Sequence, residues 1–206
     1  MSRVLPFLRN TRAASAAEFV LVLPLALLLL FGIIDVGNYA WTLNEYEKAT
    51  QMGTRFAVVN NMVSSAFATE TTETYVGTNC NGTALRAGDR ICREALGTLE
   101  CSSTGCVCAA APCPGDTGSD AAAFNELVTR MQVFQPDITA ESVRIEYQGS
   151  GLGFAGDPNK PEIAPLVTVR IVNATYNPIS LSPFGAAVPL PDFSYSLTLE
   201  DGEGAS

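Results

Sequence analysis

The sequence contains no histidine, the residue that most often serves as a general base and as a metal ligand. A serine or cysteine nucleophile would therefore have no imidazole partner. Basic residues are also scarce, because 12 Lys and Arg stand against 21 Asp and Glu and give a net charge of −9. An acidic chain is not expected to bind nucleic acid or anionic lipid. These absences predict a protein that is not an enzyme and holds no cofactor or metal.

Three short motifs resemble catalytic or binding sites but lack the residues that such sites need. Asp116-Thr117-Gly118-Ser119 matches the aspartic protease string, yet those enzymes need two such carboxylates. The glycine-rich run 149–153, which contains Ser150, has no Walker lysine, and Asp157-Pro158-Asn159 falls short of an EF-hand. We interpret all three as turns, with Asp116 able to cap a helix.

A long apolar run begins near the N-terminus. Every residue from Phe19 to Ile34 is apolar or small, and a small-residue lead-in from Ala13 extends the run to 22 positions, or about 33 Å of helix. This length predicts one transmembrane helix over 14–36, after a basic leader over 1–13. A cleaved secretory signal is the alternative, but no small-x-small cleavage site follows the run.

Two residues inside the run are unusual for a membrane helix. An ionised Glu18 would cost about 2.5 to 3.5 kcal/mol at membrane depth, so we expect it to have a partner. Pro24 frees a backbone carbonyl and permits a kink, which membrane helices tolerate.

Charge is distributed unevenly about this run. Arg3, Arg9 and Arg12 precede it, whereas the 172 residues from Asp35 onward carry a net charge of −11. The positive-inside rule then predicts a cytoplasmic N-terminus and an external C-terminal domain.

The helix is expected to continue outside the membrane over 37–62, because apolar residues recur there at intervals of three and four. This stripe is expected to pack mostly in the core of its own domain, while its membrane-proximal part packs on other helices. Tyr39 and Trp41 suit the membrane interface. The stripe comprises Tyr39, Leu43, Tyr46, Ala49 or Thr50, Gly53, and Phe56 or Ala57.

All six cysteines lie within 34 residues, which predicts three disulfides in a loop-rich insertion over 63–120, with a short helix at 88–96. Fifteen pairings are possible. A thiolate zinc site is the rival interpretation, but paired CxxC knuckles are absent. The cysteines are Cys80, Cys92, Cys101, Cys106, Cys108 and Cys113.

The remaining segment, 121–206, has the pattern of a helix followed by a sheet. Asp120 is positioned to cap a helix over 121–135. Strands are predicted at Ser142–Gln148, Leu166–Tyr176 and Phe193–Leu199, the first two with alternating apolar residues. The fold class is therefore α+β, with a long N-terminal helix, a disulfide-containing insertion and an antiparallel sheet packed on a helix.

The N-terminal landmarks together resemble a known family. A small-residue junction at Ala13-Ala14, followed by Glu18 and an apolar helix, resembles the class III signal of type IV pilin-like proteins. The further landmarks resemble the TadE/TadG-like family of tight-adherence (Tad) pilus systems: Glu18-Phe19, Leu23-Pro24, Gly32-Ile33-Ile34-Asp35-x-Gly37, Ala49 and Gly53-x-Arg55.

The resemblance implies a type IV pilin-like fold and a minor pilin, or pseudopilin, that acts in pilus assembly, adhesion and surface attachment. Its processing site would be Ala13-Ala14. Its partners would be other pilin-like subunits and the assembly machinery, with the anchor in the bacterial inner membrane and the C-terminal domain in the periplasm or the pilus. The implied subunit-contact residues are Glu18, Phe19, Pro24, Gly32, Asp35 and Gly37.

A second hypothesis assigns the chain to a different class. The disulfide-rich insertion could recognise a surface receptor, which would make the protein a membrane-anchored adhesin that is not built into the filament.

Overall fold

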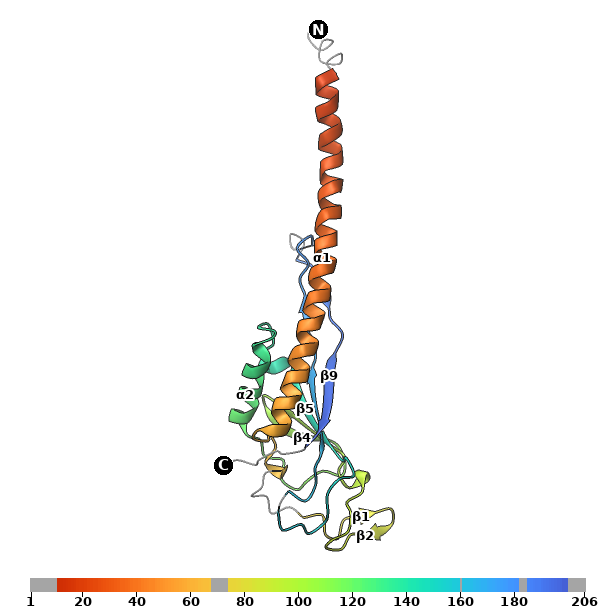
Figure 1. The fold of residues 1–206 in the computed structure, drawn as a ribbon, viewed down its shortest axis with the longest axis vertical. Coiled ribbons are helices and arrows are strands. Elements are labelled where there is room, and N and C mark those ends of the chain that lie inside the picture. Colours follow the sequence, from red (N-terminus) through yellow and green to blue (C-terminus); the bar gives the residue numbers. More distant parts are fainter. Residues whose placement is uncertain (1–10, 68–73, 160, 182–184, 200–206) are drawn as a thin grey trace. The chain divides into compact units, whose positions relative to one another are not determined.

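The computed structural model describes residues 11–67, 74–159, 161–181 and 185–199, with side chains from residue 16 onward. Most of the predicted leader, residues 1–10, lies outside this part. The chain forms two compact units: Met1–Thr42 with Thr175–Val188, and Leu43–Ala174 with Pro189–Ser206. Residues 11–42 of helix α1 (Thr11–Val59) belong to the first unit and residues 43–59 to the second. Figure 1 shows this helix and the strands.

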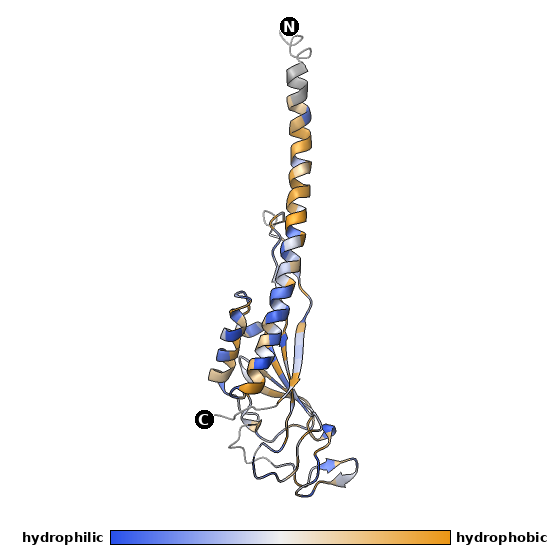
Figure 2. Cartoon of the chain, in the orientation of Figure 1, coloured by the Kyte–Doolittle hydropathy of each residue, from blue (hydrophilic) through white to orange (hydrophobic). Residues whose placement is uncertain are grey.

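Helix α1 (Thr11–Val59) is a single α-helix of 49 residues that contains Pro24. The predicted passage from an apolar segment to an amphipathic one without a break is therefore confirmed. Figure 2 shows the change from apolar to polar residues along the helix. The helix ends three residues before the predicted boundary at Met62.

The second unit contains a five-stranded antiparallel sheet in the order β4-β3-β5-β6-β9. The predicted antiparallel sheet is confirmed, and the strands predicted at 142–148 and 193–199 correspond to β5 and β9. The strand predicted over 166–176 is divided, because Asn173 adopts a positive φ: β6 ends at Ile171, and Thr175–Tyr176 form a separate short strand. The strands are β3 (Thr98–Ser102), β4 (Gly105–Ala110), β5 (Val143–Gln148), β6 (Leu166–Ile171) and β9 (Phe193–Thr198).

One face of this sheet is apolar and packs on helices. The alternating apolar residues of β5 and β6 are all fully buried: Val143, Ile145, Tyr147, Val167, Val169 and Ile171. The Tyr46 ring of α1 stacks on Phe193 at 5.2 Å between centroids, and Thr54 Oγ1 donates to the Tyr195 carbonyl at 3.0 Å. The amphipathic stripe of α1 therefore fills the core of its own domain over this part.

Helix α2 (Ala121–Gln132) begins where the sequence predicts. The Asp120 carboxylate accepts hydrogen bonds from the backbone N–H groups of Ala122 and Ala123 at 2.8 and 3.0 Å, as an N-cap should. The helix buries Phe124, Leu127, Val128 and Met131. It ends at Gln132, shortly before Pro136.

The opposite face of the sheet is polar and internally paired. Arg170 Nη1 lies 2.6 Å from Glu146 Oε1, and the hydroxyls of Thr168 and Ser196 lie 2.7 Å apart on neighbouring strands. The alternation along each strand thus separates an apolar face from a hydrogen-bonded one.

The cysteine region differs from the sequence-based expectation. It is not only a loop, because β3 and β4 belong to the main sheet and β3 lies between β4 and β5. The predicted helix at 88–96 is wrong, since the structure has only the 3-10 turn η3 (Arg93–Ala95). A small hairpin of β1 (Asn79–Cys80) and β2 (Thr83–Ala84) precedes it.

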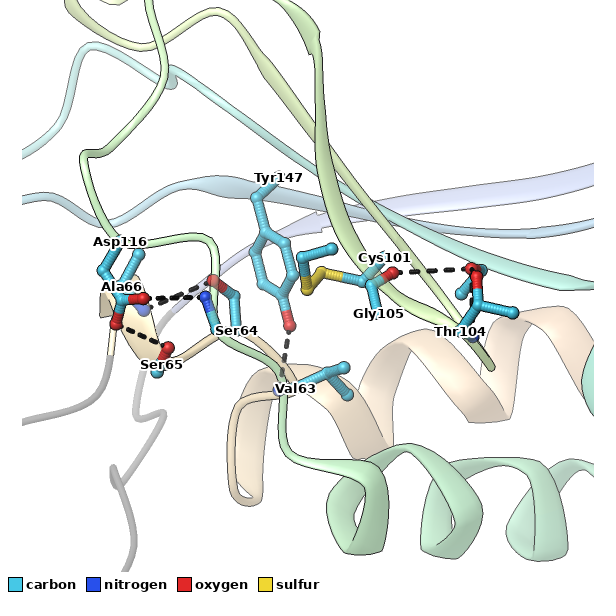
Figure 3. Close-up of a disulfide and its surroundings, with 12 residues drawn as sticks. Val63, Ser64, Ser65, Ala66, Cys101, Thr104, Gly105, Asp116 and Tyr147 are labelled. Atoms are coloured by element: carbon cyan, nitrogen blue, oxygen red, sulfur yellow. Dashed lines mark hydrogen bonds between the residues drawn. A yellow bond between two sulfur atoms is a disulfide. The ribbon is translucent and has the colours of Figure 1, made fainter.

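The three predicted disulfides are present, and each joins a cysteine to the next cysteine along the chain. They are Cys80–Cys92, Cys101–Cys106 and Cys108–Cys113. The second is a cross-strand bridge, because Cys101 and Cys106 are partners in the β3–β4 register. Tyr147 lies beside this bridge (Figure 3).

The first unit combines the N-terminal part of α1 with a segment from the C-terminal half of the chain. Strand β7 (Thr175–Tyr176) pairs with β8 (Val188–Pro189) to form a short ribbon. After β7, Asn177–Leu181 form a loop that bears on the candidate site.

Candidate assembly site on the N-terminal helix

The apolar part of α1 presents its side chains to the surroundings. Phe19, Leu21, Leu25 and Leu29 are each more than 60% exposed, and nearly all of the apolar window is uncovered by the rest of the chain. Among the described residues this is the one helix long and apolar enough to cross a membrane. A helix buried in a soluble core would be covered instead, so this segment fits a single-pass membrane anchor.

The predicted subunit-contact residues occupy different environments along this helix. Glu18, Phe19 and Pro24 are exposed. A methyl group added at Gly32 or Gly37 would meet no atom within 4 Å, so the space beside both glycines is open. Ala13 and Ala14 lie within the α1 backbone, and their side chains are outside the described part of the chain.

Asp35 differs from the others because another segment of the same chain covers it. Only 7% of Asp35 is exposed. Its Oδ1 accepts a hydrogen bond from the Ile179 backbone N–H at 2.7 Å, and its Oδ2 accepts one from Ser180 at 2.9 Å. Both carboxylate oxygens are therefore satisfied by two consecutive backbone donors of the loop after β7.

Two tyrosines reinforce this contact. The Tyr176 hydroxyl donates to the Asp35 backbone carbonyl at 3.2 Å, and the Tyr176 ring meets Tyr39 edge to face at 5.6 Å between centroids. Asp35 thus makes an intrachain contact, whereas the sequence predicts only a role toward other subunits. The partner segment was missed, although its Pro-Ile-Ser-Leu sequence is unusually apolar for a loop.

Of the three motifs interpreted as turns, only Asp157-Pro158-Asn159 forms a turn; 116–119 and 149–153 are irregular segments, and Asp120 rather than Asp116 caps α2. The Asp116 carboxylate accepts from the Gly118 N–H and from the Ser65 hydroxyl, each at 2.8 Å, and these hydrogen bonds lower the pKa of Asp116. Ser150 donates to the Ala164 carbonyl, and Asp157 accepts from the Asn159 N–H. Within the described residues, no group of three or more Cys, Asp or Glu is placed to hold a metal ion.

Comparison with known proteins gives one finding. Residues 13–55 match the model of the family described as TadE-like protein. No curated protein and no solved structure matches the chain. The matched segment contains the exposed apolar helix, Asp35 and the Gly53-x-Arg55 landmark, which confirms the resemblance drawn from the sequence. The similarity to the TadE-like family is therefore carried by residues 13–55 of the N-terminal helix, and the rest of the chain lies outside the match.

Proposed function

We propose that this protein is a minor pilin, or pseudopilin, of a Tad-type pilus, and that it acts in pilus assembly and surface attachment without catalysing a reaction. The observation that carries the proposal is the coincidence of two features in one segment. The TadE-like match covers residues 13–55, and the same helix leaves its apolar side chains uncovered from Phe19 to Ile34. A helix of this kind can reside in a bilayer and later pack against equivalent helices in a filament.

Glu18 gives this packing a register. Its carboxylate is exposed at the start of the apolar segment, where an ionised group is costly unless a cation neutralises it. A positive group of a neighbouring subunit, such as the new amine at Ala14 after leader removal, supplies that partner. Subunits are then aligned by charge pairing as well as by apolar contact.

The second unit suits a self-contained domain that the N-terminal helix carries. Its core is complete within the chain, because α1 from Tyr46 to Val58 packs with the sheet while the polar face is paired internally. Three disulfides constrain the region before α2, which favours an oxidising compartment such as the periplasm or the cell exterior.

Complementation of a strain that lacks the gene tests the role of Glu18. We expect Glu18→Ala to abolish surface pili while the protein stays in the membrane fraction after carbonate extraction. Glu18→Gln should fail in the same way, because it keeps the shape and removes the charge. Glu47→Ala, which alters an exposed residue of α1 beyond the apolar segment, is the matched control and should keep normal piliation. Normal piliation with Glu18→Ala would overturn the proposal.

One observation favours an anchored adhesin as the second candidate. Within the loop closed by Cys80–Cys92, every residue from 81 to 90 except Leu85 is exposed. The double variant Thr83→Ala/Arg86→Glu changes this surface and leaves β3 and β4 in place. Loss of attachment with pili still present would favour the adhesin, and unchanged attachment would favour the structural subunit.

A further inference from the structure

The loop that covers Asp35 contacts α1 at the point where the apolar segment of the helix ends. Asp35 follows Ile33 and Ile34 directly and is the first ionisable residue after Glu18. Because Ile179 and Ser180 donate their backbone N–H groups to its carboxylate, the loop is held at this point. All of these residues belong to the first compact unit.

Apolar side chains surround this contact. On α1, Ile33 is 66% exposed and Val36 is 70% exposed. On the loop, Ile179 is 53% exposed and Leu181 is 41% exposed, although both are large aliphatic residues outside any core. The apolar surface of the helix therefore continues onto the loop.

The loop belongs to an uncharged stretch of an acidic chain. No charged residue occurs between Arg170 and Asp192, whereas the chain from Asp35 onward carries a net charge of −11. A solvent-facing loop of such a chain would be expected to carry charge, and a surface that meets hydrocarbon would not.

The depth of the loop follows from helix geometry. The segment from Phe19 to Val36 spans about 27 Å at the rise of an α-helix, close to the ~30 Å hydrocarbon core of a bilayer. When this segment crosses a membrane, Asp35 lies at one edge of the hydrocarbon. Trp41 follows about 9 Å farther along the helix, where an aromatic ring suits the headgroup region.

We propose that the loop Asn177–Leu181 is a second membrane contact, with Ile179 and Leu181 entering the boundary between headgroups and acyl chains where α1 leaves the bilayer. The lipid that covers Ile33 and Val36 is at the right depth to cover these two side chains. Asp35 is the positioning residue: by pairing with two backbone N–H groups, it fixes the loop and satisfies donors that could not stay unpaired near lipid. The inference rests on the membrane anchor alone and does not require a role in a pilus.

The test uses tryptophan fluorescence, because Trp41 is the only tryptophan in the chain. Full-length Trp41→Phe/Ile179→Trp is reconstituted into vesicles of phosphatidylcholine brominated near the headgroup end of its acyl chains. We expect blue-shifted emission that the brominated lipid quenches strongly. Trp41→Phe/Leu181→Trp should show the same blue shift and quenching. This second variant keeps the test valid if the first variant misfolds.

The matched control is Trp41→Phe/Val59→Trp, because Val59 is 54% exposed and is the last residue of α1, outside the apolar segment. Its emission should stay red-shifted and unquenched. Adding Asp35→Ala to the Ile179→Trp variant should reduce quenching while carbonate extraction still shows an inserted helix.

Two results would overturn the proposal. In the first, the tryptophans of the Ile179→Trp and Leu181→Trp variants emit at as long a wavelength as that of Val59→Trp and are no more quenched by the brominated lipid. The other is a blue shift that appears only at high protein-to-lipid ratio without quenching, since a second copy of the chain would then cover the loop. Because no pilus is involved, these outcomes are independent of the Glu18 experiment.

Discussion

Tyr147 is a fully buried residue that joins three parts of the second unit. Its hydroxyl accepts a hydrogen bond from the Val63 backbone N–H at 3.2 Å, and its ring lies 5.1 Å from that of Phe67. Burial raises the pKa of Tyr147 to about 12, because the phenolate would lose its hydration inside the core. The Tyr147 phenol is therefore neutral in the folded state.

This pKa predicts a loss of stability at high pH. The unfolded chain titrates near pH 10 and the folded chain near 12, so the contribution is complete below pH 10 and is lost as the pH rises toward 12. The free energy of unfolding should fall by about 3 kcal/mol over this range from this group alone. Chemical denaturation of the detergent-solubilised protein measures it.

Tyr147→Phe is the control for this pH dependence. It should be less stable at neutral pH by about 1 to 3 kcal/mol, because the buried Val63 N–H loses its acceptor. Its unfolding free energy should also fall less steeply above pH 10 than that of the parent chain. Equal slopes for the two proteins would show that Tyr147 does not set the effect.

Gly53 and Gly37 are both family landmarks, yet their surroundings differ. A methyl group at Gly53 would lie 2.8 Å from Met131 Cγ and Sδ, and Met131 is fully buried. We expect Gly53→Leu to destabilise the second unit by about 1 to 3 kcal/mol through overpacking, and Met131→Ala to restore part of this loss. Urea denaturation of the single and double variants checks this.

Gly37 provides the comparison. Because nothing lies within 4 Å of a methyl group at this position, Gly37→Leu should leave the unfolding free energy within about 0.5 kcal/mol of the parent value. Under the proposed function it should still reduce piliation, since the open space beside Gly37 is then filled by another helix. Normal piliation would mean that no helix approaches there.

At the scale of elements, the β3–β4 hairpin depends on a cross-strand bridge. Cys101 is fully buried, and its disulfide to Cys106 closes a short loop at the turn of this hairpin. Replacing both by alanine should lower the free energy of unfolding by about 2 kcal/mol in the chain-entropy model. Thermal denaturation of the double variant measures this, and an unchanged midpoint would contradict it.

The sequence predicts elements well where local signals are strong. The apolar run specified α1, Asp120 specified the start of α2, and alternation specified β5 and β6. Strands β3 and β4 were missed because they are short and contain Val107 as their only β-branched apolar residue, so that they lack an alternating apolar run, and their pairing is set by cross-strand contacts and a disulfide. Spacing alone also left the disulfide pairing open.

The contact at Asp35 shows why part of the candidate site was not predictable. Asp35 and Ile179 are 144 residues apart, and no local pattern links a carboxylate at the end of a membrane helix to two backbone N–H groups of a distant loop. The sequence marked Asp35 as a landmark but gave no indication of its partner. The exposure of Glu18 and the open space at Gly32 likewise depend on the packing of the folded chain and not on a local sequence pattern.

At the scale of the whole molecule, charge and apolarity are sorted along the chain. Three arginines precede the apolar helix, acidic residues dominate after it, and the Asp35 loop is uncharged. This pattern suits a single-pass membrane anchor, and the contact with the bilayer that we propose for the loop would be apolar rather than electrostatic.

The most direct test of the pilus role is the N-terminal sequence and intact mass of the protein recovered from native membranes and from sheared surface fibres. A pilus subunit is expected to occur in the fibres with its mature chain beginning at Ala14, after cleavage by a prepilin-type peptidase. Recovery only from the membrane, with Met1 intact, would contradict a place in the filament.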